Sequence, residues 1–185
     1  MSEQAAAYGS QGLRTLRIEI PGEPHAQQRQ RHRLVKTKSG REFVHGFQPQ
    51  KSINWKAVAQ GHFHAEMLAA GLRPFDGPVR LVIVAYFPCP RSEWRKREPR
   101  PERPSMASKD WDNVGKSVSD AGSGVLYLDD RQVVDARVVK RIAAQGEPAR
   151  VVVFVSEFYE ADVSSLRESG NTLSQPRVFP NSIQP

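Results

Sequence analysis

Cysteine is almost absent from this chain of 185 residues. The single thiol, Cys89 in the segment FPCP, cannot form an intramolecular disulfide, and it excludes a zinc site built from cysteines. We expect Cys89 to be a small buried apolar residue at the end of a strand.

Long apolar runs are missing as well. No segment approaches the roughly 20 apolar residues that a membrane helix needs, and the N-terminal MSEQAAAYGSQG lacks the basic start and apolar core of a secretory signal. These absences argue against a membrane partner and predict a cytoplasmic protein. If its partner is DNA, we expect it on the nucleoid of a bacterium or of a phage-infected cell.

What the chain has in excess is positive charge. Its formal net charge is +7 and its pI is about 9.9, while 38 % of its residues are hydrophobic. That composition is enough for the core of one domain, and the charge favours a polyanionic partner, with nucleic acid first. Residues 1–13 and 158–185 are polar without periodicity, so we expect two flexible tails around one domain at 14–157.

Periodicity and turn signals predict the elements of this domain. Strands are expected at 16–20 and 77–87, a hairpin at 33–45 with Ser39-Gly40 at its tip, and two or three further strands in VLYL, QVVDARVVKRIA and ARVVVFVSEF. A helix at 52–72 is indicated by the spacing of its apolar residues Ile53, Trp55, Val58, Phe63, Met67 and Leu68, and a second helix should span about 112–122. The segment 88–109, rich in proline and arginine, should be a loop. This order predicts an α+β fold, a mixed and largely antiparallel sheet with two helices on it.

Acidic residues gather in the stretch KDWDNVGKSVSDAGSGVLYLDDRQVVD, although the chain as a whole is basic. Asp112 is a good N-cap for the second helix, and Lys116 and Asp120 follow at intervals of four residues on one helical face. LYLDD could end a strand and direct an acid back toward Asp110 and Asp112. Three converging carboxylates need either a raised pKa or a cation, and oxygen ligands favour Mg²⁺ or Mn²⁺ as that cation. The alternative is that these acids only cap a helix and solubilise loops.

The motif D-W-D-N-V-G-K-S-V-S-D followed by L-Y-L-D-D-R-Q-V-V-D resembles the RusA family of Holliday junction resolvases. The segments IPGEPHAQQRQRHR and GPVRLVIVAYFPCPRS resemble the opening and central parts of the same family. The resemblance implies a RusA-like fold and an endodeoxyribonuclease that resolves four-way junctions by paired symmetric nicks in recombination and repair. It departs from the family in Trp111, which replaces an aliphatic residue.

The resemblance also assigns roles by position. It implies that Asp110, Asp112 and Asp130 hold Mg²⁺, with Mn²⁺ as a substitute, and that Lys116 is catalytic. Supporting roles beside this site fall to Asn113, Asp120 and Asp129, with Asp129 the alternative to Asp130 as third ligand. A homodimer is implied because resolution needs two cuts, and no small-molecule cofactor is expected. The expected DNA contacts are Arg29, Arg31, Arg33, Lys36, Lys38, Arg91, Arg95, Lys96 and Arg97.

Three other functions stay open from the residues. A phosphatase or glycosyltransferase with a DxD motif would place the motif after a hydrophobic strand, whereas Asp110 follows the loop PERPSMASK. A non-catalytic DNA-binding module would keep these acids for structure alone. A metal nuclease could also act on branched DNA other than four-way junctions.

Overall fold

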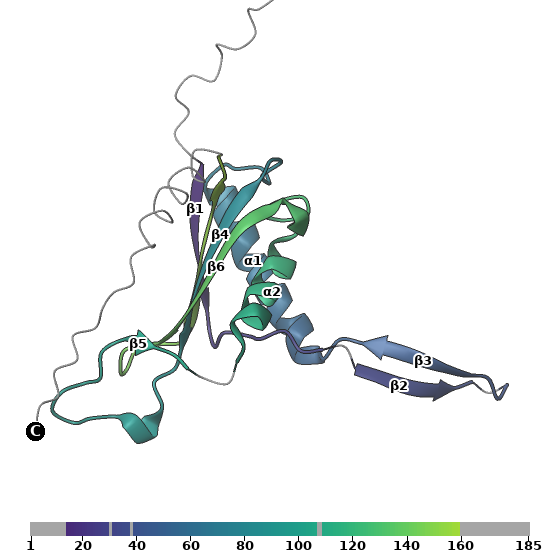
Figure 1. Cartoon of the computed structure of the whole chain (residues 1–185), viewed down its shortest axis with the longest axis horizontal. Helices are drawn as coiled ribbons and strands as arrows, with labels where there is room; N and C mark the ends of the chain where they lie inside the picture. The colour runs from purple at the N-terminus through teal and green to yellow at the C-terminus, as the bar shows by residue number, and fades with distance from the viewer. Residues whose placement is uncertain (1–13, 30, 38, 107–108, 160–185) are drawn as a thin grey trace, which may run out of the picture.

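The computed structural model describes residues 14–29, 31–37, 39–106 and 109–159. Its strands are β1 (Thr15–Pro21), β2 (Arg31–Lys36), β3 (Glu42–Phe47), β4 (Val79–Phe87), β5 (Arg103–Pro104), β6 (Val133–Ile142) and β7 (Arg150–Glu157). Its α-helices are α1 (Gln50–Ala69) and α2 (Trp111–Gly122), and two 3-10 turns are η1 (Arg91–Glu93) and η2 (Asp130–Gln132). The predicted α+β class is confirmed, as Figure 1 shows. No helix in this described part is long and apolar enough to cross a membrane.

The main sheet has five strands in the order β1-β7-β4-β6-β5. β4 and β6 run parallel, and every other pair in the sheet is antiparallel. A parallel pair needs a crossover, and the chain between β4 and β6 supplies one that contains α2. The predicted mixed, largely antiparallel sheet is therefore correct, and the parallel pair explains why α2 lies across it.

Both helices pack on one face of this sheet (Figure 1). Along β4 every second residue is buried, from Val79 to Phe87, as expected for a strand with one face on the core. Phe63 of α1, Val118 of α2 and Ile83 of β4 belong to the same buried cluster. This packing fixes α2 against the sheet and thereby fixes the acidic residues at its two ends.

The β2–β3 hairpin stands apart from this body. Its strands pair only with each other in a separate two-stranded sheet, which extends sideways from the lower end of α1 in Figure 1. We call residues 31–47 the hairpin arm. The predicted hairpin is confirmed, with Ser39 and Gly40 in its turn.

Two sequence predictions of local structure are wrong. VLYL is no strand: Val125, Leu126 and Tyr127 are all buried, and the segment forms only isolated bridges beneath α2. Burial on every side removes the alternation that a strand of a two-layer fold would show. The segment 88–109 is not loop throughout, because it contains η1 and the two-residue strand β5.

The predicted first helix is confirmed, and only part of its apolar pattern is buried. Ala59, Phe63 and Met67 form its buried stripe at intervals of four residues, and Trp55 continues it. Three apolar residues of the pattern that predicted the helix are exposed: Ile53, Val58 and Leu68.

The predicted tails on either side of the domain, residues 1–13 and 158–185, lie mostly outside the residues that the structure describes. Residues 1–13 and 160–185 of the predicted tails lie outside them. Phe158 and Tyr159 are described, and they contact the body: the Phe158 amide donates to the Pro78 carbonyl oxygen at 3.0 Å, and the Tyr159 hydroxyl donates to Glu157 at 2.8 Å.

Candidate active site

Helix α2 begins at Trp111, one residue before the predicted start of its span at about 112. Asp110 is the N-cap and Trp111 is the first helical residue, so Asp112 lies in the first turn and does not cap the helix. The Asp110 side chain accepts no capping hydrogen bond from the helix, which is unusual because N-cap aspartates normally accept one. Its Oδ2 instead lies 3.4 Å from the Asn113 amide nitrogen. The carboxylates of Asp110 and Asp112 are both exposed.

A groove of about 550 Å³ runs beside this helix end. It is lined by Glu23, Pro24, His25, Ala26, Gln27, Gln28, Lys51, Lys109, Asp110 and Asn113. Lys109 fixes its edge, because its Nζ donates to Glu23 Oε1 at 2.7 Å and to the Pro24 carbonyl at 2.8 Å. The carbonyl of Lys109 in turn accepts a bond of 2.6 Å from Lys140 on β6. The position of Asp110 is therefore tied to the segment that follows β1 and to β6.

A second hollow of about 210 Å³ shares residues with this groove. Gln27, Gln28 and Asn113 line both, and the second adds Arg29, Gln48 and Lys116. Lys116 is exposed, and within the described residues it forms no ion pair with Asp112 or Asp120. The structure thus brings Asp110, Asn113 and Lys116 to one continuous surface, with both the predicted lysine and the acids open to a ligand.

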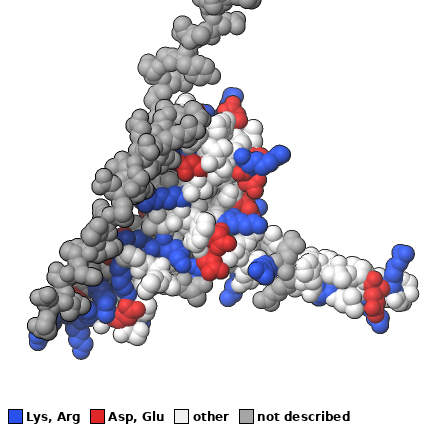
Figure 2. Space-filling view, viewed as in Figure 1, with Lys and Arg blue, Asp and Glu red and all other residues white. Residues whose placement is uncertain are grey.

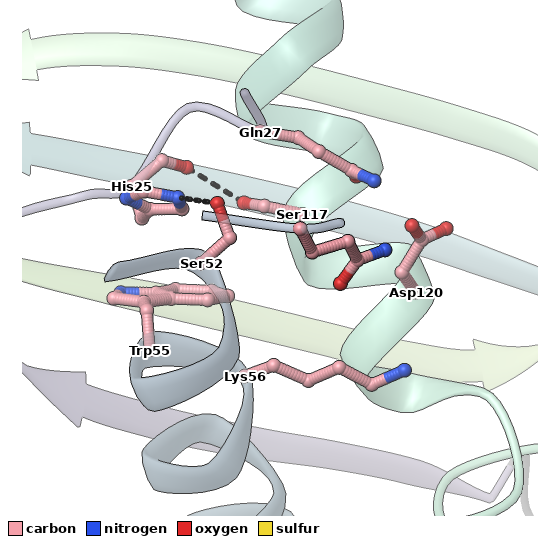
Figure 3. A pocket seen from close by; sticks show the side chains of 8 residues that line it. His25, Gln27, Ser52, Trp55, Lys56, Ser117 and Asp120 are labelled. Carbon is pink, nitrogen blue, oxygen red and sulfur yellow. Dashed lines mark hydrogen bonds between the residues drawn. The ribbon is translucent and has the colours of Figure 1, made fainter. Parts of the chain in front are cut away.

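The segment between β1 and β2 is held against α2 by a short network (Figure 3). The backbone amide of Gln27 donates to the backbone carbonyl of Asn113 at 2.9 Å. The Ser117 hydroxyl donates to the backbone carbonyl of His25 at 2.6 Å. The His25 ring hydrogen-bonds Ser52 of α1 at 2.8 Å. Burial, with Lys109 and Lys51 nearby, lowers the pKa of His25, so its ring is neutral at pH 7.

Below this network lies a small cavity of about 30 Å³, lined in part by Gln27, Ser117 and Asp120 (Figure 3). The side-chain oxygen of Gln27 is buried there without a hydrogen-bond partner in the described part of the chain. The cavity has room for one water that could satisfy it. Asp120, which lines this cavity, is about two helical turns beyond Asp112. It is thus separated from the acids at the start of the helix.

The acids beyond the other end of α2 have a different environment. Asp129 caps η2: its Oδ1 accepts bonds of 2.9 Å from both the backbone amide and the Nε of Arg131. Gln132 completes the capping box by accepting from the Asp129 amide at 2.8 Å, and its amide group donates to Phe75 and Gly77. Arg131 holds the pKa of Asp129 well below its usual range. Asp130 is exposed beside this cap.

The predicted convergence of three aspartates does not occur within one chain. A helix of 12 residues is about 18 Å long. Asp110 caps its start, whereas Tyr127, three residues before Asp130, packs at its far end and donates to the Ser119 carbonyl at 2.9 Å. Among the described residues, no three His, Cys, Asp or Glu side chains lie close enough to hold a metal. The sequence could not show this, because VLYL packs at the far end of α2, where Tyr127 lies against Ser119 and Gly122.

The predicted DNA contacts lie in two regions. Arg29, at the base of the hairpin arm, lines the hollow beside Lys116, and Arg33 is exposed on the arm. Lys36 pairs with Glu42 at 2.7 Å. Arg91, Arg95, Lys96 and Arg97 are exposed in the segment between β4 and α2, at the lower left of Figure 2, where blue side chains gather. The side chain of Arg31 and all of Lys38 lie outside the description.

Sequence reasoning did not identify His25, Gln27 or Lys109 as part of this site. Lys109 directly precedes Asp110, and PHAQQ directly precedes the basic stretch, so their positions were a usable signal. Their role could not be read from the chain, since it depends on contacts between residues more than 80 positions apart.

The donor set at the start of α2 suits a hard divalent cation. Asp110 and Asp112 offer carboxylate oxygens that no helix cap uses, and Asn113 adds an amide. Such oxygen donors fit Mg²⁺ or Mn²⁺. Two carboxylates from one chain leave such an ion with few protein ligands, so a further acid is needed for a tight site.

Comparison with known proteins agrees with this geometry. The family model of endodeoxyribonuclease RusA matches residues 21–156, which include both helices and the motif around Asp110. A Bacillus subtilis (strain 168) protein named "Uncharacterized protein YqaN" is 32 % identical over 150 residues, covering 77 % of this chain and 96 % of that protein. This chain therefore belongs to the RusA family of endodeoxyribonucleases.

Proposed function

We propose that this protein is a Mg²⁺-dependent endodeoxyribonuclease that resolves four-way DNA junctions by paired symmetric nicks, as a homodimer acting in recombination and repair. Mn²⁺ is expected to substitute for Mg²⁺. No small-molecule cofactor and no membrane enter this proposal. Its place of action is the cytoplasm, on the nucleoid.

One observation carries the proposal. At the start of α2, the exposed acids Asp110 and Asp112 lie within two turns of the exposed Lys116, and Arg29 borders the same hollow as Lys116. A phosphodiesterase needs anions to hold a metal and cations to receive phosphates, side by side. Membership of an endodeoxyribonuclease family makes DNA the nucleic acid in question.

The chain's own residues divide the chemistry among them. Asp110 and Asp112 would hold the Mg²⁺, which when bound lowers the pKa of a water and offsets the charge of the phosphate. In the overall reaction a water oxygen would bond to phosphorus in line, the bond to the 3′ oxygen would break, and a water proton would go to that oxygen, so the products would carry 5′-phosphate and 3′-hydroxyl ends. An ammonium offers only donors, so Lys116 is no metal ligand. It stabilises charge on the phosphoryl or leaving oxygen instead.

Asp130 takes part from a second copy of the chain. It lies beyond the far end of α2 from Asp110, and it is exposed, whereas its neighbour Asp129 is engaged by Arg131. A two-fold dimer can bring the Asp130 of one copy to the helix start of the other, and it does so twice. This arrangement supplies the third carboxylate and the two symmetric sites that paired nicking requires.

Mixing two inactive variants tests this arrangement. Asp112→Asn and Asp130→Asn subunits, refolded together, should recover roughly a quarter of the wild-type nicking sites, because half the dimers are mixed and one of their two sites is intact. If all three acids act within one copy, both sites of every mixed dimer carry a defect and nicking stays absent. The two variants assayed separately provide the baseline.

The function itself is tested by cleavage of a labelled four-way junction beside a linear duplex of the same arm sequence, with Mg²⁺ or with chelator. Symmetric, metal-dependent nicks in the junction alone are expected. Tight binding without cleavage in Mg²⁺ or Mn²⁺ would make the protein a non-catalytic module. Cleavage of forks in preference to junctions would keep the nuclease and change its substrate.

A further inference from the structure

The hairpin arm has two faces of different chemistry. Residues directly opposite one another in an antiparallel pair share a face. The register pairs Val35 with Phe43 and Arg33 with His45, and Phe47 follows on the same side of β3. Every residue of β3 is exposed, with Phe43 at 46 % and Phe47 at 38 %. We call the side with Phe43, His45 and Phe47 the ring face.

The rings on this face are spaced for intercalated bases. Alternate residues of an antiparallel strand lie about 6.8 Å apart. Stacked bases follow one another at about 3.4 Å, so one base fits between Phe43 and His45 and another between His45 and Phe47. Aromatic side chains in such rows are the usual platform for unpaired bases, because every base has a flat apolar face.

The opposite face lacks this pattern. It carries Leu34 and Val44, which face each other across the hairpin at 63 % and 65 % exposure, the Lys36–Glu42 ion pair, and the exposed His32 opposite Gly46. A single imidazole forms no row of rings, and aliphatic side chains and a neutralised charge offer little to a nucleotide. The ring face, in contrast, has the exposed guanidinium of Arg33 opposite His45, in reach of a backbone phosphate.

The arm is continuous with the candidate active site. Arg29 and Gln48, which precede and follow it, both line the hollow that contains Lys116 and Asn113. A strand that crosses this hollow is thus led toward the arm. The chain's net charge of +7 further favours a polyanion over a second copy as the occupant.

We propose that the ring face binds unpaired nucleotides of a branched DNA, with bases stacked on Phe43, His45 and Phe47 and a phosphate bound by Arg33. The class of DNA rests on the proposed function, but the stacking does not. The arm then selects branch points, where bases are unpaired, over continuous duplex.

The test compares binding of two DNAs by the full chain in chelator, where no cleavage occurs. One is a fork with a short unpaired gap that contains 2-aminopurine, and the other is a linear duplex of equal length. Phe43→Leu with Phe47→Leu removes the rings but keeps the apolar character. Leu34→Ala with Val44→Ala is the matched change on the other face, and Phe43→Tyr with Phe47→Tyr keeps the rings.

The leucine variant should bind the fork tenfold or more weakly and lose the quenching of 2-aminopurine, while its duplex binding changes less than twofold. The tyrosine variant and the opposite-face variant should both match wild type. Equal losses on fork and duplex, no loss on either, or conversion of a dimer to monomers in light scattering by the leucine variant would overturn the proposal, the last in favour of a second copy as occupant.

Cleavage of the same forks and of four-way junctions in Mg²⁺ by the wild-type chain separates this inference from the nuclease. Quenching without cleavage of either DNA would reject the nuclease and keep the ring face. Cleavage by a leucine variant that binds forks like wild type would reject the ring face and keep the nuclease.

Discussion

Aspartates lie at the start of α2 and beyond its far end, and their carboxylates differ in whether the protein itself binds them. At the start, the side chain of the N-cap residue Asp110 accepts no capping hydrogen bond, and both it and Asp112 are exposed at or beside a groove. Beyond the far end, Asp129 accepts three hydrogen bonds from Arg131 and caps η2. One pair of acids is left open for a ligand, while Asp129 is used by the protein itself.

Within one sequence motif, the carboxylates at the start of α2 are open to a ligand, whereas that of Asp129 is bound by Arg131. Asp110 and Asp112 lie at the positive end of the helix dipole, and no capping bond to the helix backbone takes up the side chain of Asp110. Asp129 is stabilised by a specific cation, and that bond positions its neighbour Asp130 on the surface. The acids that a sequence motif groups together therefore differ in whether groups of the protein itself already bind their carboxylates.

The largest expected effect is on junction cleavage, from substitutions at the start of α2. Lys116→Ala and Asp112→Asn should each reduce junction cleavage by about 10²–10³-fold, since each removes a group that acts on the reacting phosphate. Binding measured in chelator should change little, and Asp112→Asn should tighten it by removing a charge that repels DNA. Single-turnover cleavage and fluorescence anisotropy measure the two quantities. Parallel loss of binding and cleavage would contradict both roles.

The next effect distinguishes the two adjacent acids beyond the far end. Asp130→Asn should reduce cleavage by about 10²-fold or more if it completes the metal site. Asp129→Asn should cost less than tenfold, because its carboxylate is already bound by Arg131. The same single-turnover assay, repeated over a range of Mg²⁺ concentrations, should show an increased Mg²⁺ requirement for Asp130→Asn alone. The reverse order of effects would make Asp129 the third ligand.

Much of the fold could be predicted from local signals. The alternation in LRIEI and the run LVIVAYF predicted β1 and β4, and the turn at Ser39-Gly40 predicted the arm. These elements follow from periodicity and turn chemistry, which depend only on neighbouring residues. The prediction that Asp112 is the N-cap was nonetheless wrong: either aspartate suits that position, and the N-cap is Asp110, two residues earlier.

The site was less accessible to sequence reasoning. Asp110, Asn113 and Lys116 share one surface because helical spacing alone brings them together. The placement of Asp130 depends instead on how VLYL packs beneath α2, where Phe75 donates from its amide to the Leu126 carbonyl at 2.8 Å. A continuous apolar run does not reveal which of its sides will be buried, and so its direction was mistaken.

A smaller effect concerns the packing of the far end. A Cβ at Gly122 would lie 2.8 Å from the hydroxyl oxygen of Tyr127, whose ring is fully buried. Gly122→Ala should therefore lower the free energy of unfolding by about 1–3 kcal/mol. Gly61→Ala in α1, where nothing lies within 4 Å, is the control and should raise it by about 0.5–1 kcal/mol. Urea denaturation measures both, and equal effects would contradict the close packing.

The smallest expected effect is the dependence of stability on acid at Asp129. Because the pKa of Asp129 is lower in the folded chain than its unfolded value of about 4, its pair with Arg131 stabilises the fold above that pH and is lost as pH falls. Arg131→Ala should thus lower the urea midpoint at pH 7, and the gap to wild type should narrow from pH 4 toward pH 2. Since both side chains are well exposed, 1 M NaCl at pH 7 should shrink the gap too. If the difference in urea midpoint between wild type and Arg131→Ala changed with neither pH nor salt, Arg131 would act through packing. The contrast between the two ends of α2 would then rest on the capping bonds alone.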